Sequence, residues 1–207
     1  PVNSTSNTWT PELANKTAPL VLVDLGKSAM GGSCLLQVYN QLGDEAPTVY
    51  NNKQFKGFCE AIMELHALET SVVGAYHDRS DGGVLVTLLE MAFASRCGLK
   101  INASANKSGN LIADLFNEEL GAVFQVLDMA KFKQVMNNHG IYDDLISVVA
   151  EPLQDSLNVE IVDGQENQVV YKAVLNDLLS AWSETSYLVQ ELRDNPDAAK
   201  EEFGNLK

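Results

Sequence analysis

The stretch that decides the fold runs from residue 72 to residue 103 and reads VVGAYHDRSDGGVLVTLLEMAFASRCGLKINA. This pattern predicts a buried strand at 72–76, a polar, glycine-containing loop at 77–83, a helix to about Cys97, and a second strand at 99–103. A strand–loop–helix–strand unit places its loop at the carboxyl end of the first strand, where ligands of open α/β sheets bind. We therefore expect the functional residues in loop 77–83.

Further elements flank this unit on both sides, and most follow from short apolar runs or helical spacing of apolar residues. In chain order we expect a strand at 20–23, helices at 31–42 and 54–69, a short helix ending at Gly121, a strand at 122–126, a helix at 131–139, strands at 145–150, 157–161 and 169–171, and a helix at 174–193. We expect Trp182, on that last helix, to lie in the core of the protein, and Pro196 to stop the helix. The fold class is α/β or α+β, a layered α/β/α domain with a mixed sheet.

Composition excludes several classes of function. The chain has 207 residues, 45% of them apolar, with 14 Lys plus Arg against 28 Asp plus Glu, which gives a net charge of −14. Such a surface repels phosphate backbones, so we expect no nucleic-acid partner. Every apolar run falls far short of the roughly 18 residues of a membrane helix, and no signal peptide is recognisable, so we expect a soluble, cytoplasmic protein without a membrane partner. Three widely spaced cysteines without a C-x-x-C pair fit a reducing compartment.

Loop 77–83 has the chemistry of a site for a metal-bound phosphate. Its two glycines let the backbone approach a ligand, and the following helix begins there with unpaired N–H groups. Asp78 offers a hard carboxylate, and Mg²⁺ is commonly held by one or two carboxylates together with phosphate oxygens. The alternative is an ordinary strand-to-helix turn in which Ser80 or Asp81 caps the helix, with Asp81 as the N-cap. The spacing alone leaves both open.

Two other acidic positions admit two interpretations each. Asp24 also follows a buried strand and could lie on the same sheet edge as Asp78, or it could simply cap a turn. The run of Asn117, Glu118 and Glu119 before Gly121 could offer carboxylates, but an exposed last helical turn closed by glycine explains it equally well.

Five groups of sequence strings, in order, carry a resemblance to a known family. They are DLG with the later GGS from Asp24, QVY with QLG from Gln37, AYHDRSDGGVLVTLLEMAFA from Ala75, LFNEELGAV from Leu115, and WSETSY with LRDNP from Trp182. Together they closely resemble phosphoribosylformylglycinamidine synthase of the large, single-chain type, over nearly the whole chain from about residue 19 to 203. The resemblance implies the C-terminal domain of the second of two aminoimidazole-ribonucleotide-synthetase-like halves.

The resemblance further implies a domain division and a function. Residues 1–18 are polar and without periodicity, which by itself predicts a linker or flexible arm. By the resemblance, 19–172 would be the synthetase-like domain and 173–207 a helix and linker toward a glutaminase domain. Proteins of this family are ligases of purine biosynthesis that use ATP and glutamine to convert formylglycinamide ribonucleotide into formylglycinamidine ribonucleotide, glutamate, ADP and phosphate. Position by position, Asp78 would be a Mg²⁺ ligand and Ser80 a nucleotide contact in an auxiliary ATP/ADP site.

The same resemblance limits what this chain can do by itself. No residue here matches a catalytic position, so none of the three cysteines is expected to be catalytic. The partners would be the remaining domains of the same enzyme, namely the first synthetase half and the glutaminase domain, and the chain alone is expected to be inactive. Two other hypotheses stay open: a free-standing nucleotide-binding or scaffold module without catalysis, and a metal-dependent hydrolase that uses Asp24 and Asp78.

Overall fold

A seven-stranded mixed sheet forms the centre of the molecule. The computed structural model describes residues 8–68, 70–103, 109–164 and 168–206. The strands are β1 Leu20–Asp24, β2 Val73–Asp78, β3 Gly98–Asn102, β4 Gly121–Val126, β5 Ile146–Leu153, β6 Asn158–Asp163 and β7 Gln168–Val174. Their order across the sheet is β2-β4-β1-β5-β3-β6-β7, in which β3 and β6 pair parallel and the other neighbours pair antiparallel. The predicted mixed sheet is confirmed.

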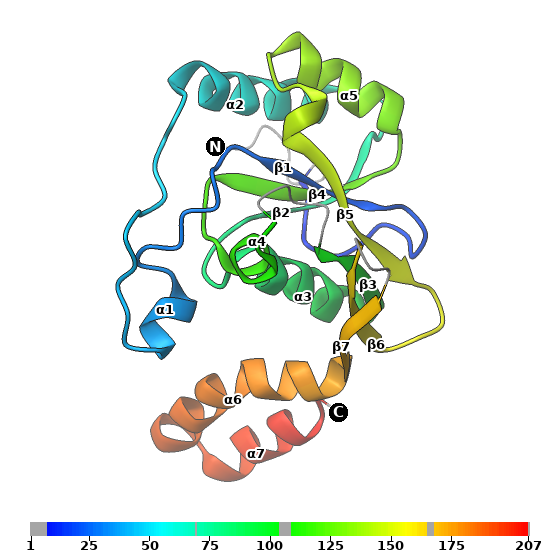
Figure 1. The fold of residues 1–207 in the computed structure, drawn as a ribbon. Coiled ribbons are helices and arrows are strands. Elements are labelled where there is room, and N and C mark those ends of the chain that lie inside the picture. The colour runs from blue at the N-terminus through cyan, green and yellow to red at the C-terminus, as the bar shows by residue number, and fades with distance from the viewer. Residues whose placement is uncertain (1–7, 69, 104–108, 165–167, 207) are drawn as a thin grey trace.

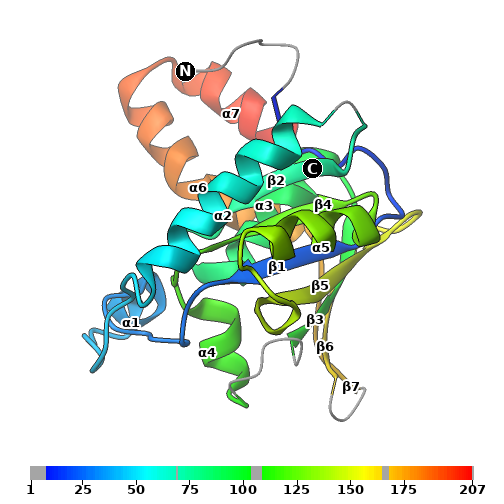
Figure 2. The same cartoon turned by 90° about the horizontal axis from the view of Figure 1, so that it is seen from above.

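Helices cover both faces of the sheet and produce the expected three layers (Figures 1 and 2). One face carries α2 Asn52–Ala67 and α5 Met129–Asn138, and the other carries α3 Gly83–Ser95 and α4 Leu111–Phe116. Successive residues of a strand point to opposite faces, so the apolar run of β1 serves two cores. Leu20 and Leu22 join the core under α3, whereas Val21 and Val23 join the core under α2 and α5.

The unit at residues 72–103 has the predicted strand, loop, helix and strand, but its two strands are not neighbours in the sheet. β2 and β3 run parallel, but β4, β1 and β5 lie between them in the sheet, so the connection through α3 crosses three strands. β2 also continues two residues beyond the predicted strand, through His77 and Asp78, which places Asp78 at the strand end.

The segment after β1 is less helical than predicted. The helix expected at 31–42 is limited to α1 Cys34–Val38, which begins after Ser33, whose hydroxyl caps the Leu36 N–H. It ends early because Asn40 adopts a left-handed backbone with φ 54°.

The C-terminal helices form a pair that projects beyond α3, away from the sheet (Figure 1). α6 Leu175–Arg193 agrees with the predicted helix, but Pro196 does more than end it. Pro196 opens α7 Pro196–Gly204, where Asn195 is the N-cap, as is common for proline in a first helical turn. The expectation that Trp182 lies in the core is wrong, because the residue is 55% exposed.

The described part of the expected N-terminal arm, residues 8–18, packs against the layers. Leu13 is buried, and the buried side chain of Gln125 accepts the N–H of Ala14 at 2.8 Å and donates to the carbonyl of Asn15 at 2.7 Å. The domain boundaries at residues 18 and 172 stay predictions. Among the described residues, no helix is long and apolar enough to cross a membrane.

Candidate functional site

The ends of β1 and β2 meet at one edge of the sheet, on either side of the start of β4. Asp24 pairs with Gly121 and Asp78 pairs with Ala122, so the two acidic residues lie on the same edge. This is the placement that one of the two interpretations of Asp24 required. The side chains, however, have different surroundings.

Arg79, directly after Asp78, is an internal anchor for the loop. Its fully buried side chain donates from Nη2 to Asp24 Oδ1 at 2.7 Å and to the Leu120 carbonyl at 3.0 Å, and from Nε to the Glu119 carbonyl at 2.6 Å. Asp24 Oδ1 also accepts the N–H of Gly26 at 2.9 Å. Asp24 is therefore a structural ion-pair partner that closes a turn, and this pairing weighs against a hydrolase with Asp24 and Asp78 as joint metal ligands.

The interpretation of Asp81 as the N-cap of α3 is wrong. The N-cap is Gly82, with φ 85°, and its N–H is accepted by Glu118 Oε1 at 2.8 Å, a carboxylate 36 residues away. Gly83 follows with φ 72°, and a Cβ there would lie 2.7 Å from the carbonyl oxygens of Leu115 and Asn117. Only glycine fits this close approach of the start of α3 to the end of α4.

Of the two interpretations of the segment from Asn117 to Glu119, the exposed last helical turn is wrong. α4 ends at Phe116, and both Asn117 and Glu119 are fully buried. Glu118 Oε1 accepts a second backbone N–H, that of Cys34, at 2.8 Å. The segment thus joins the start of α1 to the start of α3.

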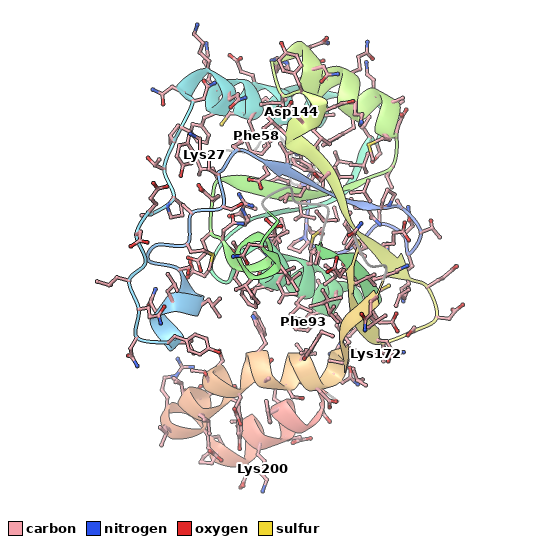
Figure 3. The ribbon with its side chains drawn as sticks, in the orientation of Figure 1. Lys27, Phe58, Phe93, Asp144, Lys172 and Lys200 are labelled. Carbon is pink, nitrogen blue, oxygen red and sulfur yellow. The ribbon has the colours of Figure 1, made fainter. Side chains whose placement is uncertain are left out.

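Glu119 holds the loop that follows β1. Its Oε1 accepts the N–H groups of Lys27 at 2.9 Å and Ala29 at 3.0 Å and the hydroxyl of Tyr50 at 3.1 Å. Burial and the hydrogen bond to Glu119 raise the pKa of Tyr50. The ammonium of Lys27 lies 4.6 Å from the centre of the Tyr50 ring, and Figure 3 labels Lys27 on this loop. The sequence signal for these contacts was the pair of adjacent glutamates directly before a strand.

The two residues assigned by resemblance are accessible to a ligand. The side chain of Asp78 is 69% exposed, and its carbonyl faces His77 Nδ1 at 2.9 Å and accepts from Thr87 Oγ1 at 3.5 Å. Ser80 is partly buried, and its carbonyl closes the turn by accepting the Gly83 N–H at 3.0 Å. The backbone at this point is fixed, whereas the Asp78 carboxylate, with Oδ1 3.6 Å from His77 Nδ1, is largely exposed and accessible to solvent or a cation.

The loop's surroundings are acidic. Ligand atoms of Cys34, Asp81 and Glu118 all lie within 4.8 Å of one another, and burial and Glu118 raise the pKa of the Cys34 thiol. Arg79, the cation of the loop, is directed inward to Asp24. A bare phosphate would meet repulsion here, whereas a divalent cation between Asp78 and a phosphate fits the charge and the preference of Mg²⁺ for hard oxygens.

A hollow of about 400 Å³ lies between α3, α4, β6, β7 and α6. Its walls are almost wholly apolar, and Leu89, Phe116, Ile161 and Tyr171 are among the residues that line it. Phosphate groups need polar or charged partners, so this hollow is not a candidate for the phosphates of a nucleotide.

Comparisons with known proteins agree with this fold. The sequence model of the family described as AIR synthase related protein, C-terminal domain, matches residues 19–154. Phosphoribosylformylglycinamidine synthases of Saccharomyces cerevisiae and Schizosaccharomyces pombe are 48% and 40% identical over 100% of this chain. The chain spans only 16% of the length of each of these relatives.

Solved structures show the same fold at low identity. The structure described as Thermotoga maritima PurL complexed with ATP has a TM-score of 0.61 at 15% identity, over 83% of this chain and 27% of that chain. The Escherichia coli hydrogenase maturation protein HypE has a TM-score of 0.55 at 18% identity, over 81% of this chain and 51% of that chain. At these identities the likeness shows the fold alone.

Proposed function

The chain belongs to the family of the AIR synthase related protein C-terminal domain, and from this we propose that it is one domain of a phosphoribosylformylglycinamidine synthase. The observation that carries the proposal is the identity of 48% with the yeast enzyme over the whole chain. The motif strings from Asp24 to Pro196 support the second synthetase-like half as its position. The whole enzyme would be a cytoplasmic ligase that transfers ammonia from glutamine to formylglycinamide ribonucleotide at the expense of ATP.

Within that enzyme, loop 77–83 would hold an auxiliary Mg–nucleotide. Asp78 would be the metal ligand, since its exposed carboxylate stands at the end of β2 on a backbone fixed by the buried Arg79. Ser80 would contact the nucleotide, close to the left-handed Gly82 and Gly83 at the start of α3. The Mg²⁺ would neutralise charge between the carboxylate and the phosphates.

The acidic residues near loop 77–83 indicate which part of the reaction this domain would support. Within the described part of the chain, Glu118 accepts backbone N–H groups and Asp24 pairs with Arg79, so these two carboxylates have structural roles. Asp78 lies against His77 and Asp81 lies near the Cys34 thiol, and we propose a catalytic role for none of these groups. This domain would therefore support a nucleotide and contact the other domains, while the reacting groups would come from the first synthetase half and the glutaminase domain.

The test uses the native polypeptide that contains these residues. Its mass is measured in cell extract by peptide mapping, and the purified protein is assayed for formylglycinamidine ribonucleotide formation with glutamine and ATP. We expect a polypeptide several times larger than 22.5 kDa that yields a glutaminase peptide and is active. A native chain near 22.5 kDa without this activity would contradict the proposal and favour a free-standing binding module.

A further inference from the structure

A line of polar contacts connects the C-terminal helix α6 to Asp78. Trp182 Nε1 donates to Glu90 Oε1 at 3.2 Å, and Glu90 Oε2 lies 2.8 Å from His77 Nε2. The other ring nitrogen of His77, Nδ1, lies 2.9 Å from the Asp78 carbonyl and 3.6 Å from its carboxylate Oδ1. Four residues from β2, α3 and α6 thus form one continuous chain of contacts.

The middle of this line is shielded and geometrically defined. The side chains of His77 and Glu90 are only 17% and 25% exposed, whereas that of Asp78 is 69% exposed. Both carboxylate oxygens of Glu90 have a partner, and the two partners come from different elements. A carboxylate held at both oxygens has little freedom to rotate, so it fixes the plane of the His77 ring.

The outer end of the line depends on the docking of α6 on α3. The Trp182 ring lies against Phe93, with 5.7 Å between ring centroids, and Figure 3 labels Phe93 on the side of α3 that faces α6. Trp182 is otherwise half exposed, so its ring contributes to the docking of α6 on α3 through this packing and through its single N–H hydrogen bond. α6 and α7 project from the layers at this place (Figure 1).

We infer that Glu90 and Trp182 are positioning residues for Asp78, so that the docking of α6 on α3 sets how well the end of β2 holds its cation. The inference rests on the proposed Mg–nucleotide site at loop 77–83. Groups that hydrogen-bond directly to a metal ligand commonly change metal affinity about 10- to 100-fold when removed. Glu90 acts one contact further out, through His77, so we expect its effect at the lower end of that range. The line reaches Asp78 and not Ser80, so its loss should appear in the Mg²⁺ requirement.

The experiment measures ADP retention by the nucleotide-stripped, full-length protein as Mg²⁺ is titrated in equilibrium dialysis. We expect Glu90→Ala to raise the half-saturating Mg²⁺ concentration about tenfold. Trp182→Phe, which keeps an aromatic ring but removes the N–H donor, should raise it about threefold. Saturating Mg²⁺ should restore ADP binding in both. Glu90→Gln keeps an oxygen acceptor for the indole and should recover most of the loss.

Tyr187→Phe is the matched control, because Tyr187 is another aromatic residue of α6 that donates one hydrogen bond to a glutamate, Glu191, within the same helix. It should lower the thermal midpoint about as much as Trp182→Phe and leave the Mg²⁺ requirement unchanged. The inference is overturned if Glu90→Ala and Trp182→Phe behave like Tyr187→Phe while Asp78→Asn weakens Mg²⁺-dependent ADP retention. If Asp78→Asn also has no effect, or the unmodified protein retains no ADP, the proposed site itself is overturned.

Discussion

Replacing Arg79 by Met tests how the loop is anchored. Met preserves most of the length and apolar volume of the side chain but removes every donor. Three acceptors then lose a partner: Asp24 Oδ1 and the backbone carbonyls of Glu119 and Leu120. The guanidinium side chain is fully buried, so water cannot simply replace it.

The expected cost can be worked from these contacts. Removing one partner of a buried ion pair destabilises a protein by about 3–5 kcal/mol, because the remaining charge is left uncompensated. The side chain of Asp24 is 23% exposed and can gain some water, so we expect a cost at the lower end of this range, about 3 kcal/mol. For a chain of this size that corresponds to a fall of roughly 6–12 °C in the thermal midpoint.

The assay is urea unfolding of the 207-residue chain followed by circular dichroism, beside a matched surface variant. Arg193→Met removes an ion pair with Asp194 in which the two side chains are 71% and 45% exposed, and it should leave the midpoint unchanged. The reasoning is refuted if Arg79→Met costs less than about 1 kcal/mol or moves the midpoint no more than Arg193→Met does.

Three further predictions concern other parts of the fold. Iodoacetamide should modify the exposed Cys59 faster than Cys34 at pH 8, because burial and Glu118 raise the pKa of Cys34. The ratio of the two alkylation rates should fall toward one as the pH rises and more of the Cys34 thiol is ionised. A ratio of rates that does not change with pH, measured by peptide mass mapping, would contradict this. Gly83→Ala should cost roughly 2–4 kcal/mol through clash and strain, whereas Gly140→Ala, with φ 77° and open space around it, should cost about 1 kcal/mol; equal costs in urea unfolding would speak against the close approach. Burial raises the pKa of Tyr76 to about 12, above the usual value of 10, so stability present below pH 10 should be lost as pH rises toward 12; Tyr76→Phe should flatten that loss in alkaline unfolding curves, and an unchanged slope would count against it.

Much of the fold could be predicted because local patterns determine it. The continuous apolar run of β1 and the helical spacing of α6 indicated their elements within a residue or two. The same logic placed Asp24 and Asp78 at strand ends, and both lie on one edge of the sheet. Strand order could not be predicted, because it depends on pairings such as β2 with β4 that no local signal encodes.

The predictions that are wrong concern residues whose hydrogen-bond or packing partners come from segments distant in the sequence. Asp81 has the composition of an N-cap, but Glu118 already accepts the Gly82 N–H from 36 residues away, so no side chain within the loop is needed. Adjacent acidic residues usually face solvent, yet Glu119 is buried because it accepts two backbone N–H groups and a tyrosine hydroxyl from the loop after β1. Trp182 looked like a core residue from its spacing, and its real partners lie on α3.

The most direct test of the central claim is the nucleotide and magnesium content of the full-length protein after extensive desalting. The protein is denatured, and ADP or ATP is quantified by chromatography and Mg²⁺ by atomic absorption, for the unmodified protein and for Asp78→Asn. The account predicts retained Mg–nucleotide in the unmodified protein, a loss of most of it in the variant, and a lower thermal midpoint, since a ligand bound only to the native state stabilises it. Equal nucleotide and magnesium content in the two proteins would contradict the assignment of Asp78 and of loop 77–83 as the site.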